Sequence, residues 1–205
     1  MIAEYESAYS TRTDVFGTIP HRLLHDFITT SSITGRALDI GAGDGRNSIF
    51  LAENGLQVDA LDVCTPAIER LQQVTTTRGL DITPRVCAVQ DISPDLGPYD
   101  LVVADTVLCH VTREEAQSLA DTIARLLKPD GWLYAVAFAS SDPRQSEFAP
   151  VTRTYFTKKG FCHLFHTLRI THCDQKRVFD TSHGADHEHE IIQLIATREG
   201  TSDGC

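Results

Sequence analysis

Three glycines alternate with other residues directly after an apolar stretch, in the segment Asp39-Ile40-Gly41-Ala42-Gly43-Asp44-Gly45. Glycines at this spacing let the backbone turn sharply and approach a ligand that a Cβ atom would exclude. A dinucleotide fingerprint places its third glycine one position later, where this chain has Arg46. The segment is therefore predicted to be a cofactor-binding loop, but not one for NAD or FAD.

Two acidic residues narrow the choice of cofactor. Asp39, at the start of the loop, is available for an amino group, either directly or through water. Asp62 follows roughly 20 residues beyond the loop at the end of the next apolar stretch, where an acidic side chain accepts hydrogen bonds from ribose hydroxyls. A cofactor with an amino-acid tail and a ribose but no pyrophosphate suits this pattern. The spacing thus favours S-adenosylmethionine.

The residues after the fourth apolar stretch are candidates for the acceptor side of such chemistry. Methyl transfer from a sulfonium is an in-line displacement, so alignment alone can supply much of the acceleration. If the acceptor is a hydroxyl or an ammonium, His110 is the candidate general base, because it titrates near neutrality. Asp105 is the second candidate, for the methionine end of the cofactor or for a substrate amine. The alternatives are a packing role for His110 and a helix-capping role for Asp105.

Histidines also gather near the end of the chain, at His183, His187 and His189. A zinc or copper site is one hypothesis for this cluster. Alternating His and Glu also suits a solvent-facing hairpin, and the spacing fixes no fourth ligand, so we predict no metal ion. A substrate-facing role is expected for His183.

Strand-like and helix-like stretches alternate from Arg36 onward, which is typical of a parallel sheet with crossover helices. The expected strands are 36–41, 57–62, 85–89, 99–104, 132–139, 168–179 and 188–197, and the expected helices are 46–53, 65–78, 112–128 and 157–166. The prediction is one α/β domain with a Rossmann-like, seven-stranded, mostly parallel sheet, helices on both faces and an antiparallel closing hairpin.

The single domain over residues 1–205 divides into four predicted segments. Residues 1–34, with Tyr5, Tyr9, Phe16 and the amphipathic stretch 20–27, are expected to form a helical lid or substrate segment, or else ordinary core. Residues 35–140 form the cofactor-binding core. Residues 141–199 supply a substrate loop, a short helix and the hairpin, and residues 200–205 a tail.

Composition excludes several classes of function. The chain has 205 residues and a formal net charge of −10, which disfavours nucleic-acid partners because their affinity depends on clustered Lys and Arg. No apolar run approaches the ~20 residues of a membrane-spanning helix. The acidic first residues indicate a cytoplasmic protein, and the six scattered cysteines indicate neither disulfides nor a zinc knuckle. We expect a small-molecule substrate and a monomer or homodimer.

These motifs resemble those of class I S-adenosylmethionine-dependent methyltransferases, over nearly the whole chain. The segments 45–52, 54–60 and 11–13 look like the tellurite-resistance (TehB-like) branch, whereas 107–111 is nearer to the ubiquinone-biosynthesis type. In that family the acid after the third strand, or its neighbour, meets the adenine amino group, so Asp91 and Ile92 inherit this role by position. The resemblance implies cofactor contacts at Asp39, Gly41, Ala42, Gly43, Arg46, Asp62, Val63, Asp91, Ile92 and Asp105.

Transfer of a methyl group from S-adenosylmethionine to a small molecule, with S-adenosylhomocysteine as product, is the leading hypothesis. A binding module or regulator that keeps the pocket but lacks transfer activity is the alternative from another class. A nicotinamide-dependent oxidoreductase is opposed by the position of the third glycine. A duplex-DNA amino-methyltransferase is opposed by Ala104-Asp105-Thr106-Val107, where that class has two prolines and an aromatic residue.

Overall fold

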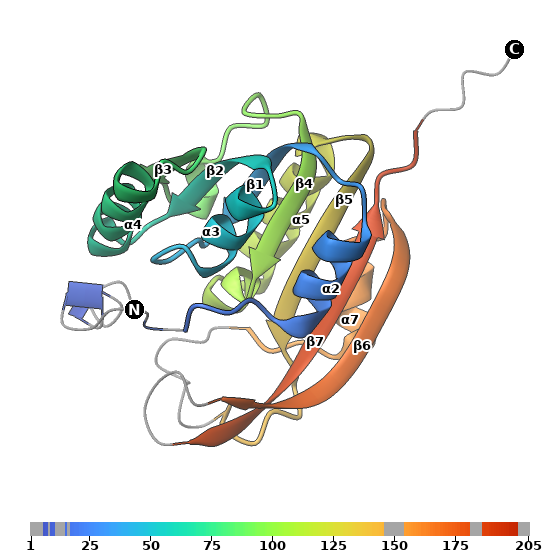
Figure 1. The fold of residues 1–205 in the computed structure, drawn as a ribbon. Coiled ribbons are helices and arrows are strands. Elements are labelled where there is room, and N and C mark those ends of the chain that lie inside the picture. Colours follow the sequence, from blue (N-terminus) through green and yellow to red (C-terminus); the bar gives the residue numbers. More distant parts are fainter. Residues whose placement is uncertain are drawn as a thin grey trace, which may run out of the picture.

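The fold is that of a computed structural model, which describes residues 6–7, 9–10, 15, 17–145, 154–180 and 186–200. Seven strands form one sheet in the order β3-β2-β1-β4-β5-β7-β6. The strands are β1 (Gly35–Ile40), β2 (Leu56–Asp62), β3 (Ile82–Val86), β4 (Tyr99–Asp105), β5 (Leu127–Phe138), β6 (Arg169–Asp180) and β7 (His187–Thr197). The first five run parallel, and β7 lies antiparallel between β5 and β6 (Figure 1). This sheet confirms the predicted fold class.

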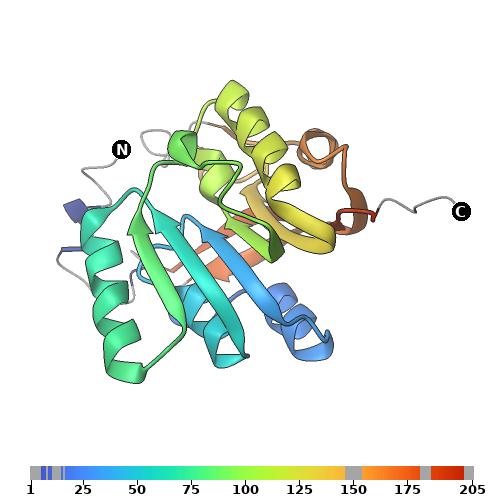
Figure 2. The same ribbon diagram turned by 90° about the horizontal axis from the view of Figure 1, so that it is seen from above.

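Helices cover both faces of the sheet, as expected (Figure 2). The helices are α2 (Arg22–Thr30), α3 (Arg46–Glu53), α4 (Thr65–Arg78), α5 (Arg113–Leu126) and α7 (Lys158–Leu164), with short 3-10 turns η1 (Val89–Asp91) and η2 (Val107–His110). One apolar core joins the sheet to α2, α3 and α4 through residues such as Leu24, Leu51 and Leu71. The other joins it to α5 and α7 through residues such as Ile123 and Phe161.

The start of α5 is fixed by a capping box. The Thr112 hydroxyl accepts a hydrogen bond from the Glu115 amide at 3.2 Å, and the Glu115 carboxylate accepts one from the Thr112 amide at 2.8 Å. Each side chain thereby satisfies an amide that the helix itself leaves without a partner. The box holds the short connection between η2 and α5, and so the position of the segment after β4.

Two strand predictions were wrong in their bounds. The third strand was expected at 85–89 but spans Ile82–Val86, with Pro84 inside it. This is an edge strand, where a proline costs no ladder hydrogen bond, and its only buried side chain, Ile82, gives a weak apolar signal. The fifth strand begins at Leu127 rather than at 132, because Leu127 already pairs with Tyr99 before a register shift.

The amino-terminal amphipathic stretch forms α2, which packs on the sheet. Leu24 and Ile28 are buried in the core, and the Phe27 ring contacts the Trp132 ring edge-on at 5.3 Å between centroids. Tyr5 and Phe16, which the lid prediction included, lie outside the described residues. Within the described part of the chain, no helix is both long and apolar enough to cross a membrane.

Candidate active site

The glycine loop between β1 and α3 has the left-handed backbone that its residue types predict. Gly41, Gly43 and Gly45 have φ values of +75°, +56° and +102°. The amides of Gly41 and Ala42 donate to the Leu61 carbonyl at 2.8 and 3.0 Å, which ties the loop to β2. A Cβ atom at Gly41 would lie 2.9 Å from the Val107 side chain. The glycines therefore also make room for neighbouring protein atoms.

Asp62, at the end of β2, is bonded directly to this loop. One carboxylate oxygen accepts from the Gly43 amide at 2.8 Å and the other from the Cys64 amide at 2.8 Å. Burial raises the pKa of Asp62, while these two hydrogen bonds oppose the shift. Val63 beside it is 41% exposed, an apolar surface next to the acid. Loop and acid thus form one unit, as their spacing predicts.

Asp39 is fully buried beneath the loop. Its Oδ2 accepts a hydrogen bond from the Ser48 hydroxyl at 2.6 Å, and its Oδ1 has no hydrogen-bond partner among the described residues. Burial raises the pKa of Asp39 to about 7, although the Ser48 hydrogen bond opposes this shift. A cation near this buried group would stabilise its ionised form and lower its pKa.

Asp105, at the end of β4, lies in a buried polar cluster. Its Oδ2 accepts from Arg46 Nη2 at 2.7 Å and from Asn47 Nδ2 at 3.2 Å, and its Oδ1 lies 3.7 Å from His21 Nε2. Burial alone would raise the pKa of Asp105, but the charges of His21 and Arg46 and the Asn47 hydrogen bond lower it. Asp105 is therefore ionised and anchors Arg46 at the carboxyl edge of the sheet.

Residues 37–131, which hold the loop, Asp62 and Asp105, match the family described as a methyltransferase domain. This segment therefore carries a methyltransferase domain. The chain is 31% identical over 112 residues to a ubiquinone biosynthesis O-methyltransferase from Chromobacterium violaceum, covering 53% of this chain and 47% of that protein. It is 34% identical over 101 residues to a tRNA 5-carboxymethoxyuridine methyltransferase from Escherichia coli, covering 48% and 38%. The chain thus spans less than half the length of these relatives.

Two solved structures share its fold. TehB from Haemophilus influenzae superposes with a TM-score of 0.75 at 18% identity, covering 95% of the methyltransferase and 67% of that chain. A Burkholderia thailandensis 1,6-didemethyltoxoflavin-N1-methyltransferase, solved with 1,6-didemethyltoxoflavin and S-adenosylhomocysteine, superposes with a TM-score of 0.72 at 18% identity, covering 97% and 87%. At this identity the likeness concerns the fold alone.

The site of this domain fits S-adenosylmethionine in its donor chemistry. Asp62 is a half-buried acid at the loop, able to accept further hydrogen bonds from hydroxyl groups. Asp39, with a pKa of about 7 and a carboxylate oxygen that no described residue bonds, suits an ammonium group. The loop glycines, Ala42 and Val63 supply the close, partly apolar approach that the cofactor's sugar and base require. Of the predicted adenine residues, Asp91 is exposed and the Ile92 side chain is buried in the core.

His110 lies half-buried at the end of η2. A positive charge on His110 lowers the pKa of Asp62, so the two side chains are within electrostatic range. The structure therefore brings His110 toward the acid expected to bind ribose. Asp105 instead belongs to the cluster with Arg46 and His21.

Two contacts near the site could not be predicted from the sequence. His21 reaches Asp105 from just before α2. Gln193 on β7 donates to the Tyr134 hydroxyl on β5 at 2.9 Å, and both side chains are buried. Pairing of β5 with β7 brings Tyr134 and Gln193 together, and no local sequence pattern predicts this contact.

The expectation of a solvent-facing hairpin was wrong for His187 and His189. Their exposed fractions are 7% and 4%, because both side chains lie on the inner face of β7. His189 Nδ1 lies 3.1 Å from a carboxylate oxygen of Asp142, and the ring packs against Phe138 at 4.8 Å between centroids. His183 lies outside the described residues.

Proposed function

We propose that this methyltransferase transfers the methyl group of S-adenosylmethionine to a small-molecule acceptor and releases S-adenosylhomocysteine. The observation that carries the proposal is the polar cluster at the carboxyl edge of β4, beside the glycine loop, where buried Asp105 and Asn47 meet half-buried Arg46 and His21. A recessed set of charged and amide groups suits orientation of a compact polar molecule. The net charge of −10 disfavours a nucleic-acid acceptor.

Each group in the site would have a defined task. When bound, the cofactor supplies an electrophilic methyl group on a positively charged sulfur. Asp62 would hold the ribose, and Asp39 the ammonium of the amino-acid tail. Arg46, held by Asp105, would orient an anionic or polar part of the acceptor. His110 would take a proton from an acceptor hydroxyl or ammonium, and with a thiolate acceptor no base is needed.

The ubiquinone biosynthesis O-methyltransferase acts on a small molecule and the tRNA 5-carboxymethoxyuridine methyltransferase on an RNA, as their names state. The net charge of this chain and the polar cluster around Asp105 therefore support the small-molecule acceptor. We place the activity in the cytoplasm, where buried thiols such as Cys64 and Cys109 stay reduced, with the protein a monomer or homodimer.

A product screen tests the proposal. The protein is incubated with methyl-labelled S-adenosylmethionine and a panel of phenols, amines, thiols and tellurite, with unmodified tRNA as a further arm, and products are identified by mass spectrometry. We expect label in a small molecule and none in tRNA. Label in tRNA would overturn the small-molecule acceptor.

Calorimetry separates the enzyme from the binding module. Binding of S-adenosylmethionine with turnover on at least one acceptor supports the enzyme. Binding without turnover on any acceptor, with S-adenosylhomocysteine bound equally tightly, favours the regulator. No binding at millimolar cofactor contradicts both.

A further inference from the structure

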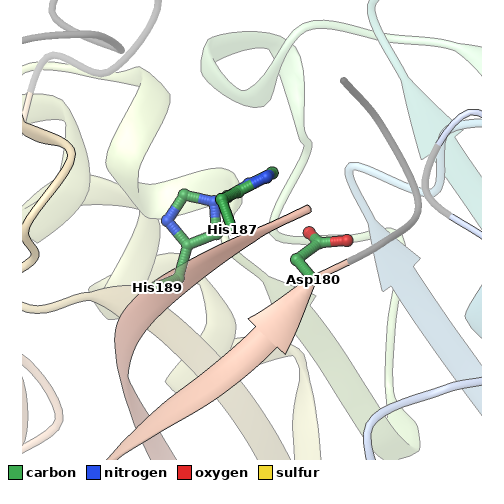
Figure 3. A group of neighbouring side chains, drawn as sticks. All are labelled: Asp180, His187 and His189. Atoms are coloured by element: carbon green, nitrogen blue, oxygen red, sulfur yellow. The ribbon is translucent and has the colours of Figure 1, made fainter. Parts of the chain in front are cut away.

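Three side chains with metal-binding atoms converge where β6 ends and β7 begins. Asp180 is paired in register with His187, and His189 follows two residues later on the same face of β7. One donor atom from each residue lies within 4.8 Å of the other two. Figure 3 shows these three side chains where β6 ends and β7 begins. Two imidazoles and one carboxylate from adjacent strands are therefore held close together.

The Nε2 atoms of the two imidazoles, which are able to bind a metal ion, already lie next to each other. His187 Nε2 lies 2.9 Å from His189 Nε2, and both residues are buried. In a tetrahedral zinc site with Zn–N bonds of about 2.0–2.1 Å, two ligand nitrogens lie about 3.3 Å apart. Moving the two rings apart by a few tenths of an ångström would thus let both Nε2 atoms bind one ion.

A carboxylate behind His189 fixes the tautomer that such a site requires. Asp142 Oδ2 lies 3.1 Å from His189 Nδ1, and the same oxygen accepts from the Glu190 amide at 2.8 Å. The other oxygen of Asp142 accepts from the Arg144 amide at 2.8 Å. An acceptor held in this way keeps the proton on Nδ1 and leaves the Nε2 lone pair for a metal, as in carboxylate–histidine–zinc arrangements.

We propose that His187, His189 and Asp180 bind one divalent transition-metal ion, with Asp142 supporting His189 from behind. Imidazole and carboxylate together suit Zn²⁺ and related ions better than Mg²⁺ or Ca²⁺, which prefer oxygen ligands. Three protein ligands leave a fourth position for water or for an oxygen, nitrogen or sulfur atom of a bound small molecule. This replaces the expectation from sequence that the chain binds no metal.

The site lies on the same side of the sheet as the buried cluster around Asp105. His189 continues the face of β7 that carries Ile191 and Gln193, and this face packs with Tyr134 of β5. His21 lies 3.7 Å from Asp105 and is also within electrostatic range of Asp180. The ion would therefore border the region proposed for the acceptor. Its binding does not depend on methyl transfer, so it can be tested separately.

The direct test is metal binding by the full chain without an affinity tag. After removal of metals, the protein is titrated with Zn²⁺ by calorimetry and with Co²⁺ by visible absorption, with Mg²⁺ for comparison. We expect one Zn²⁺ or Co²⁺ per chain, no saturable binding of Mg²⁺ and a rise in Tm with Zn²⁺. Absence of stoichiometric Zn²⁺ and Co²⁺ binding would overturn the proposal and would leave only a hydrogen-bonded His–His–Asp network.

Variants locate the ion. The double variant His187→Gln/His189→Gln should lose binding, and Asp142→Asn should weaken it about 10–100-fold through the lost support of His189. The matched control is His163→Gln/His166→Gln, which removes a stacked pair of histidines at the exposed end of α7. Equal affinity in wild type and in the His187/His189 variant overturns the site.

Because the two histidines are buried, folding of the double variant is checked by circular dichroism. If it does not fold, Asp180→Asn and Asp142→Asn decide the question, since Asp180 is half-buried at a hairpin end. Weaker binding in both supports the site. Unchanged affinity in both contradicts it.

Discussion

Arg46 Nη2 donates a hydrogen bond to Asp105 Oδ2 at 2.7 Å, and this ion pair joins the first residue of α3 to the last residue of β4. Side-chain exposure is 21% for Arg46 and 3% for Asp105. The pair links the helix that begins at the glycine loop to the strand whose end borders the region proposed for the acceptor. Buried pairs of this kind are costly to break, because the remaining charge loses its compensation.

The first prediction follows from this pair. Asp105→Asn removes the charge that most strongly stabilises the Arg46 guanidinium, and we expect a loss of about 3 kcal/mol in the free energy of unfolding. Urea unfolding at neutral pH measures it. Asp26→Asn, which breaks the exposed pair between Arg22 and Asp26, is the control and should leave stability unchanged. Equal effects of the two substitutions would show that the buried pair has no special role.

The second prediction concerns Asp39 and pH. Its pKa of about 7 lies above the ordinary value of 3.8, so the native state holds the proton more tightly than the unfolded chain does. The contribution of Asp39 to stability is therefore largest below pH 4 and is lost as the pH rises toward 7. Asp39→Asn should remove this dependence. Relative to wild type, its free energy of unfolding should rise by about 2–3 kcal/mol between pH 5 and 8.

Three charged groups near Asp39 also affect its pKa. Asp105 and Asp62 act to raise its pKa and Arg46 acts to lower it, and all three remain in the Asn variant. Comparing variant with wild type at each pH cancels their direct contributions to stability. A constant difference in unfolding free energy from pH 5 to 8 would contradict the raised pKa.

The fold and the cofactor side could be predicted because their signals are local. Glycine spacing, the distance from the loop to Asp62 and the capping box at Thr112 each depend on residues close in sequence or on strand ends that meet at one sheet edge. The alternation of apolar and amphipathic stretches predicts how strands and helices follow one another along the chain. The edge strand β3 was misplaced because only Ile82 is buried there.

The contacts of the region proposed for the acceptor could not be predicted, because they join distant parts of the chain. Asp142 and His189 are 47 residues apart, and His21 reaches Asp105 from before the first strand of the sheet. His and Glu alternate at the start of β7, but this pattern does not predict which face of the strand is buried. Antiparallel pairing of β7 with β5 decides it, and this turns His187 and His189 inward.

The third prediction tests the ribose role of Asp62. Asp62→Ala should weaken S-adenosylmethionine binding by about 1.5–3 kcal/mol, because hydrogen bonds to a charged group are lost and the Gly43 amide loses its acceptor. Calorimetry measures the affinity. Asp62→Asn keeps one acceptor oxygen, so its affinity for S-adenosylmethionine should lie between those of wild type and Asp62→Ala. Glu69→Ala, on the exposed side of α4, is the control, and unchanged affinity in Asp62→Ala would refute the role.

The fourth prediction concerns His110 as a general base. At saturating cofactor, His110→Ala should lower kcat more than tenfold for an acceptor with an ionisable proton, since general-base catalysis contributes about 10²–10⁴-fold. Because His110 is within electrostatic range of Asp62, cofactor affinity is measured in the same variant to separate binding from proton transfer. The exposed His163→Ala serves as the control. A smaller loss, with an unchanged pH profile, would assign His110 to packing.

The fifth prediction separates two costs at the glycine loop. Gly43→Ala places a Cβ atom on a backbone with φ of +56° and against the Tyr9 hydroxyl, whereas Gly79→Ala has a similar φ of +64° and open space around it. Both substitutions should cost about 1–2 kcal/mol in unfolding free energy from the left-handed backbone, and only Gly43→Ala should add a further loss from the close contact.

Tyr9→Phe in the Gly43→Ala background removes the atom that the new Cβ would meet, so it should recover part of the extra loss and of any loss in S-adenosylmethionine affinity. Urea unfolding and calorimetry on the single and double variants form a double-mutant cycle. If Gly43→Ala and Gly79→Ala cost the same and Tyr9→Phe restores nothing, the loop is held open by backbone conformation alone. If the double variant recovers, the packing of Tyr9 on Gly43 couples the amino-terminal segment to the cofactor loop.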